Sequence, residues 1–203
     1  LIDLNEAEIV GSTDRVKIVA QMDRYDGGFD GDSDWHSTKR FLIESDFDLD
    51  NLNSTELMDL GEVNMADSDT LIDFVIWASN EYPADNYALI MSNHGAGWPG
   101  GWTDPDPGVL GRHDIALAEG FGDMLFLMEM ADAFDYITKN SNIKNFELIG
   151  FDACFMSAIE VYSAIAPYAR YAVASEEVEP SLGWAYASFL AYLVDRPEID
   201  GKE

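Results

Sequence analysis

Two side chains in this 203-residue sequence could together carry out nucleophilic catalysis: His94 and the single cysteine, Cys154. Thiol catalysis needs a nucleophilic sulfur and a nearby base that takes its proton and later returns it. His94 follows a predicted strand over residues 87–92, and Cys154 follows a predicted strand over residues 146–151. Because the carboxyl ends of parallel strands meet at one edge of a sheet, we expect the two side chains to lie close together.

Residues next to this pair favour the same chemistry. A helix predicted over residues 155–166 would place Cys154 at its positive N-terminal end, where a thiolate is stabilised. Gly95 has no side chain, so its backbone N–H can approach a substrate, and with the N–H of Cys154 it could form an oxyanion hole. Asp152 lies at the same rim and would be a good partner for a basic side chain.

Each of these residues also has an ordinary structural interpretation. A lone cysteine in an apolar context is often a buried, inert side chain, and His94 could be a loop histidine with satisfied hydrogen bonds. Asp152 could cap the helix predicted after it. We interpret His36 and His113 as surface residues, because both lie in polar loops. Spacing by itself therefore leaves the catalytic and the structural interpretations open.

Predicted strands and helices alternate around these residues. The run of mostly apolar residues over 87–92 is typical of a strand covered on both faces, as in parallel sheets. The alternation predicts an α/β fold with a mostly parallel sheet flanked by helices, and we expect residues 1–203 to form a single domain. The other predicted strands cover residues 15–23, 41–44 and 171–175, and the other predicted helices cover 1–10, 68–81, a part of 122–140, and 184–194.

Charge excludes several classes of partner. The chain holds 39 acidic and 11 basic residues, a formal net charge of −28, which repels nucleic acids and disfavours anionic membrane surfaces. A cationic partner, a divalent metal or a high-salt habitat would suit such a surface. One cysteine excludes an internal disulfide framework and a cysteine-based zinc site. No apolar run approaches the length of a membrane-spanning helix.

Two stretches of alternating acids, Asp30–Asp34 and Asp46–Asp50, could supply oxygen ligands for calcium. Neither stretch has the glycine and glutamate spacing of an EF-hand loop. Solvated loops on a very acidic protein are the simpler interpretation. We therefore expect no metal site and no cofactor, with calcium as the open alternative.

Several short motifs occur in an order that resembles the clostripain-like cysteine peptidases, family C11, which share the caspase-hemoglobinase fold. The resemblance covers about residues 3–190, nearly the whole chain. The motifs are Leu60-Gly61-Glu62-Val63-Asn64-Met65, Tyr82-Pro83-Ala84-Asp85, His94-Gly95-Ala96-Gly97-Trp98, Phe151-Asp152-Ala153-Cys154-Phe155-Met156, Glu160-Val161-Tyr162, Ser175-Glu176-Glu177 and Gly183-Trp184-Ala185-Tyr186.

The resemblance implies a cysteine endopeptidase that cleaves proteins or peptides after Arg or Lys. His94 matches the family's catalytic histidine and Cys154 its nucleophile. The residue before the scissile bond, called P1, would enter a pocket with an acidic floor. The residues that the resemblance places in that pocket are Asp152, Ser175, Glu176 and, unless it is an ordinary core residue, Trp184.

Family members often cut themselves between the catalytic histidine and cysteine. Of the basic residues in that interval, Arg112 lies in a predicted loop, so we expect cleavage after Arg112; an ordinary surface arginine is the alternative. The family usually opens with a further hydrophobic strand, so we also expect this chain to be a fragment that lacks this strand and a C-terminal part. The resemblance implies an extracellular or cell-surface location and leaves the oligomeric state open.

Two other functions stay open. One is a non-catalytic binding or adhesion domain that keeps the fold and holds calcium on its acidic loops. The other is a cysteine transpeptidase, in which an amine rather than water resolves the thioester. The joint presence of His94, Cys154 and Asp152 favours an active enzyme over the binding domain.

Overall fold

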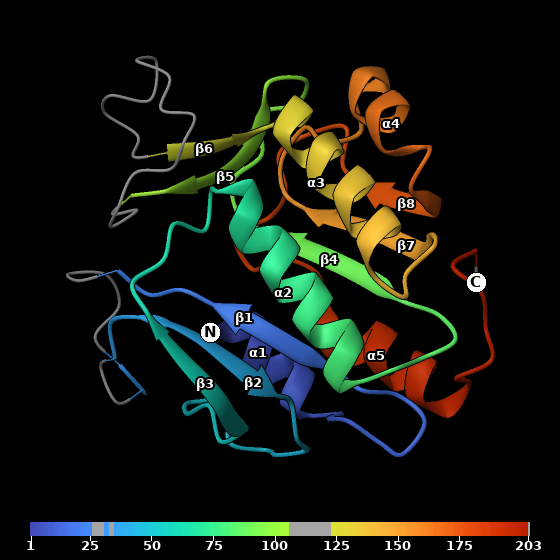
Figure 1. Cartoon of the computed structure of the whole chain (residues 1–203). Coiled ribbons are helices and arrows are strands. Elements are labelled where there is room, and N and C mark those ends of the chain that lie inside the picture. Colours follow the sequence, from blue (N-terminus) through green and yellow to red (C-terminus); the bar gives the residue numbers. More distant parts are fainter. Residues whose placement is uncertain (26–30, 33–34, 106–122, 203) are drawn as a thin grey trace. The chain divides into compact units, whose positions relative to one another are not determined.

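The computed structural model describes residues 1–25, 31–32, 35–105 and 123–202. Within these residues the chain divides into two compact units: Leu1–Val63 with Leu182–Ile199, and Asn64–Ser181 with Asp200–Glu203. The expectation of one peptidase domain stays a prediction. The elements in chain order are α1 (Ile2–Glu8), β1 (Val19–Met22), β2 (Thr38–Leu42), β3 (Thr55–Gly61), α2 (Ser68–Glu81), β4 (Ala88–Ser92), β5 (Gly100–Asp104), β6 (Asp123–Phe126), α3 (Leu127–Asn140), β7 (Phe146–Asp152), α4 (Ile159–Ile165), β8 (Ala169–Ala174) and α5 (Tyr186–Asp195) (Figure 1).

The first unit pairs a small antiparallel sheet with two helices. Its strand order is β1-β2-β3, and the buried Phe41 and Ile43 pack in one cluster with Ala7 of α1 and Leu190 of α5. The Glu8 side chain of α1 is fully buried and accepts the backbone N–H groups of residues 53 and 54, just before β3. This carboxylate therefore ties α1 to the start of β3.

The second unit is built on a parallel sheet with the strand order β4-β7-β8. Leu89 and Met91 of β4 and Ile149 and Phe151 of β7 pack in one buried cluster. Three helices contribute to that cluster, so α2, α3 and α4 cover this face of the sheet (Figure 1). The predicted α/β fold with a parallel sheet is confirmed. Among the described residues, no helix combines the length and the apolar character needed to cross a membrane.

An antiparallel pair of strands, β5 and β6, lies where the sequence predicts no strand. The glycines in and around β5 permit close backbone contact. A Cβ atom on Gly100 would lie 2.3 Å from the carbonyl oxygen of Leu125, and one on Gly101 would lie 2.6 Å from that of His94. The glycine content therefore reflects tight packing of a strand pair.

The helix predicted over residues 155–166 is shorter than expected, because α4 begins at Ile159. Phe155 has a φ of 62°, in the left-handed region, which a right-handed helix cannot contain. The chain therefore turns sharply after β7 before α4 starts.

Candidate active site

The strands that precede His94 and Cys154 are adjacent and parallel, as expected. Ser92 at the end of β4 is level with Asp152 at the end of β7. The backbone N–H of Asn93 then donates to the carbonyl oxygen of Asp152 at 3.3 Å. Both candidate catalytic residues thus leave the sheet at the same edge.

Beyond that edge, Gly95 lies directly against the backbone of Cys154. A Cβ atom on Gly95 would stand 2.2 Å from the carbonyl oxygen of Cys154 and 3.0 Å from its nitrogen. It would also lie 2.9 Å from a side-chain carbon of Met156, which is fully buried. No side chain fits at Gly95 without a shift of the backbone, so this glycine brings the His94 and Cys154 segments together.

Hydrogen bonds on both sides fix the backbone of His94. Its N–H donates to the side-chain oxygen of Asn93 at 2.6 Å, and its carbonyl accepts the N–H of Trp102 at 2.8 Å. The Asn93 amide also donates to the carbonyl of Thr103 at 3.1 Å. The His94 side chain is exposed. Asn93 is therefore a positioning residue, which the sequence analysis missed because its partners belong to the unpredicted strand pair.

The environment of Cys154 differs from the expected one. Its half-buried thiol does not lie at a helix N-terminus, so the expected stabilisation by a helix dipole is wrong. The N–H of Glu179 instead donates to the sulfur at 3.3 Å. Asp152 does not cap α4 either, because the N-cap is Ala158 and has no side-chain capping bond.

Two further backbone bonds join the Cys154 turn to the segment after β8. Phe155 donates its N–H to the carbonyl of Glu177 at 3.0 Å, and Ser157 donates to that of Ser175 at 2.9 Å. Residues 154–157 and 175–179 are thus joined by three hydrogen bonds and lie side by side. Sequence reasoning could not find this pairing, because main-chain hydrogen bonds between distant loops leave no residue pattern.

The predicted P1-pocket residues fall into two groups. Asp152 is 4% exposed, and the register that pairs Phe151 with Ala174 brings Ser175 alongside it. Glu176 follows Ser175 and is exposed. Trp184 belongs to the other compact unit, where its ring meets that of Phe189 edge-on at 6.4 Å. The second unit by itself therefore gathers Asp152, Ser175 and Glu176 at one edge.

The structure does not test the predicted cleavage at Arg112 or the predicted properties of the two acidic stretches. Arg112 lies outside the described residues, as does most of the acidic stretch over residues 30–34. In the stretch over residues 46–50, Asp48 accepts the side-chain N–H of Asn51 and the backbone N–H of Asp50, and these bonds lower the pKa of Asp48. Its carboxylate thus bonds to its own loop, and the expectation of no metal site, with calcium as the alternative, stays a prediction.

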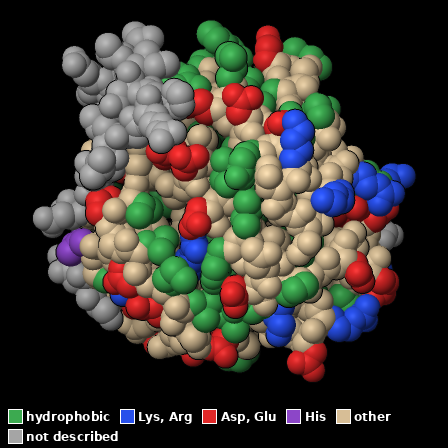
Figure 2. Space-filling model, viewed as in Figure 1, with side chains coloured by type: hydrophobic (Ala, Val, Ile, Leu, Met, Phe, Trp, Pro, Cys, Tyr) green, Lys and Arg blue, Asp and Glu red, His purple; other side chains and the backbone are tan. Residues whose placement is uncertain are grey.

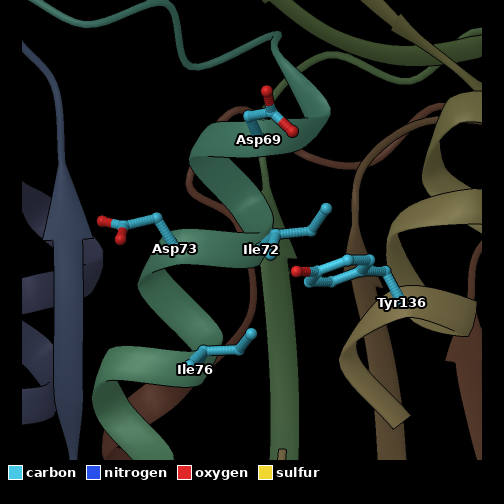
Figure 3. Close-up of a pocket in the computed structure, with 5 residues that line it drawn as sticks. All are labelled: Asp69, Ile72, Asp73, Ile76 and Tyr136. Carbon is cyan, nitrogen blue, oxygen red and sulfur yellow. The ribbon is translucent and has the colours of Figure 1, made fainter. Parts of the chain in front are cut away.

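A pocket between α2 and α3 is separate from the predicted site. Ile72 points toward Tyr136 across it, while Asp73 points the other way (Figure 3). None of the predicted site residues lines this pocket, so it has no part in the chemistry at the sheet edge. Its lining residues are Asp69, Ile72, Asp73, Ile76 and Tyr136.

Comparison with known proteins settles the family. The model of peptidase family C11, described as the clostripain family, matches residues 2–203. The chain belongs to the clostripain family. The predicted membership in this family of cysteine peptidases is thereby confirmed. Clostripain of Hathewaya histolytica is 34% identical over 105 residues, which cover 49% of this chain and 18% of that protein.

Solved structures of clostripain-family proteases have the same fold. A secreted C11 cysteine protease from Bacteroides thetaiotaomicron, in complex with an irreversible peptide inhibitor, aligns with a TM-score of 0.66 at 23% identity. An inactive zymogen C11 protease from Parabacteroides distasonis aligns with a TM-score of 0.65 at 20% identity. These alignments cover 94% of this chain, 48% of the first structure and 46% of the second. The caspase-hemoglobinase-like fold is confirmed, and the chain spans about half of these structures.

Proposed function

We propose that this protein is a cysteine endopeptidase that cleaves after Arg, and less readily after Lys, with His94 and Cys154 as the catalytic pair. The contact of Gly95 with the Cys154 backbone carries this proposal, since it holds the two segments at one rim. Family membership supports the reaction class.

The proposed reaction has two halves. Cys154 gives its thiol proton to His94, and its sulfur attacks the carbonyl carbon of the scissile bond. The N–H groups of Gly95 and Cys154 stabilise the oxyanion that forms. Protonated His94 then gives its proton to the leaving amine as the C–N bond breaks, which leaves a thioester on Cys154. Water gives a proton to His94 and attacks the thioester, so that the C–S bond breaks and the carboxylic acid product leaves. The proton on His94 then returns to the Cys154 sulfur.

The P1 preference rests on Asp152. A nearly buried carboxylate beside Ser175, at the edge where Cys154 lies, suits a cationic side chain. Arg can bind such a carboxylate through two parallel N–H bonds, whereas Lys offers a single ammonium group. We extend the proposed pocket to Glu176, which adds a second carboxylate next to Ser175.

Three further proposals follow the family. The substrate is a protein or peptide with a basic P1 residue, the enzyme processes itself after Arg112, and it acts outside the cell or at its surface. The last proposal is supported by the relative from Bacteroides thetaiotaomicron, which is described as secreted.

Matched fluorogenic peptides that end in Arg, Lys, Asp or Leu test the proposed function. In reducing buffer, we expect cleavage after Arg, weaker cleavage after Lys, and no cleavage by a Cys154→Ala variant. Cleavage after Asp or Leu would retain the thiol chemistry and overturn the role of Asp152. A folded protein that cleaves none of these peptides would overturn the proposal and leave a binding domain as the better interpretation.

A further inference from the structure

Two large aromatic side chains lie exposed on the segments that carry His94 and Cys154, and the proposed mechanism uses neither. Trp98 is 69% exposed and follows the Gly95 turn, and Phe155 is 43% exposed and directly follows the nucleophile. Exposed apolar surface that gathers in one place often marks a binding surface. Because both residues belong to the segments that carry the proposed catalytic pair, the ligand that we consider is the substrate.

The backbone of Phe155 is held in a conformation that a bulky residue rarely adopts. Its φ of 62° lies in the left-handed region, and its N–H is fixed by the carbonyl of Glu177 at 3.0 Å. Such strained residues persist where the surrounding structure imposes them, and they gather at functional sites. The strained backbone of Phe155 therefore indicates a functional role for this residue.

The two aromatic residues lie on neighbouring segments. A Cβ atom on Gly97 would lie 3.8 Å from the Cβ of Phe155 and 3.4 Å from its carbonyl oxygen. Trp98 is the next residue after Gly97. The turn that carries Trp98 therefore packs on Phe155, and this is the turn that begins at His94.

The direction of the substrate follows from the proposed mechanism. The P1 side chain lies toward Asp152 and Ser175, between β7 and β8, while the leaving amine lies beside His94, which follows β4. The residue after the scissile bond, called P1′, must therefore run from Cys154 toward the His94 turn. That direction leads to Gly97, Trp98 and Phe155.

We propose that Trp98 and Phe155 form the P1′ subsite and select substrates in which a large apolar residue follows the basic one. This inference rests on the proposed function and adds a second specificity element to it. An apolar P1′ side chain would cover the exposed ring surface of both residues and lose its own contact with water. Small or acidic P1′ residues would leave that surface exposed.

Internally quenched peptides that differ at P1′ alone test this inference. With Arg at P1, we expect kcat/KM for Phe or Leu at P1′ to exceed that for Ser by roughly tenfold. Trp98→Ala and Phe155→Gly should each bring this ratio close to one. Glycine is chosen at position 155 because it adopts a positive φ without strain, so the turn keeps its backbone.

Two control variants and two possible outcomes separate the inference from misfolding and from the proposed function. Trp98→Phe keeps an aromatic ring, so it should keep most of the P1′ preference. If Trp98 had a purely structural role, Trp98→Ala would lower kcat/KM equally for every P1′ residue. Tyr136→Ala removes an exposed aromatic residue of α3 outside the site and should leave the ratio unchanged. Equal rates for Phe and Ser at P1′, with cleavage after Arg intact, would overturn the subsite alone. Absence of cleavage after Arg in every peptide would overturn both proposals.

Discussion

At the scale of single residues, Gly95 decides whether the two candidate catalytic segments can meet. We predict that Gly95→Ala lowers kcat/KM for Arg peptides by about 100-fold, since a misplacement of roughly 1 Å has effects of that size. The added methyl group would stand 2.2 Å from the backbone oxygen of Cys154, so the backbone must move. Steady-state kinetics measure this loss.

Gly61→Ala is the matched control for Gly95→Ala. A Cβ atom at Gly61 meets no atom within 4 Å, although the residue has a φ of +69°. We expect this variant to lose about 1 kcal/mol of stability, from backbone strain, and to keep its activity. Gly95→Ala with a kcat/KM close to that of the original protein would contradict the proposed contact.

Asp152 yields a second prediction at the same scale. Citrulline has the shape of arginine but no charge, so an acidic pocket should prefer Arg over citrulline at P1 by at least about tenfold. In Asp152→Asn we expect that preference to disappear, mainly through slower cleavage of the Arg peptide. Asp85→Asn, a change in an exposed loop, should leave it intact. An undiminished preference in Asp152→Asn would assign the selectivity to another acidic residue.

At the scale of elements, the position of α1 depends on one buried carboxylate. Glu8 accepts the N–H of Asn53 at 2.9 Å, and both the N–H and the hydroxyl of Ser54 at 2.6 Å. We predict that Glu8→Ala lowers the free energy of unfolding by about 2–4 kcal/mol, because it removes the buried acceptor of three part-buried hydrogen bonds. Urea denaturation followed by circular dichroism measures the loss.

Glu8→Gln is the control for this prediction. Its amide oxygen can accept the same N–H groups, so we expect a smaller loss than in Glu8→Ala. Equal losses in both variants would mean that the charge, rather than the acceptor geometry, holds α1 to residues 53 and 54.

The elements also show how far the sequence predicts the fold. Long periodic or continuously apolar segments, such as α2 and β7, appear close to their predicted bounds. The strands β3 and β5 were missed because β3 is mostly exposed and does not alternate apolar with polar residues, and β5 begins with two glycines. Residue patterns predict elements that bury one face, and these two strands depend on partners elsewhere in the chain.

The same limit applies to the candidate site. His94, Cys154 and Asp152 could be found because each follows or ends a predictable strand. The roles of Asn93 and Glu179 could not be found, because both act through hydrogen bonds with segments distant in sequence. The prediction of a helix starting next to Cys154 was wrong, because Phe155 adopts a positive φ that its residue type disfavours.

At the scale of the whole molecule, charge dominates. Acidic side chains are spread over the face shown in Figure 2, and Lys and Arg are fewer there. With a formal net charge of −28, the protein should attract cationic peptides over distances that salt shortens to about 10 Å at 0.1 M.

We therefore predict a salt effect that depends on the charge of the substrate. For an Arg peptide flanked by lysines, kcat/KM should fall several-fold between about 0.02 M and 0.2 M NaCl, mainly through KM. For the same peptide flanked by glycines, the fall should be much smaller. Equal salt dependence of the two peptides would show that the protein's net charge has no part in substrate capture.

The pairing of residues 154–157 with residues 175–179 has an evolutionary consequence. Three bonds connect the two segments, and all of them use main-chain N–H groups of one segment or the other. A substitution at the exposed Val178 leaves these donors and acceptors in place, whereas a one-residue insertion beside it would shift the donor that faces the Cys154 sulfur. Related sequences should therefore vary in residue type at this position, while the number of residues between Ser175 and Glu179 stays fixed.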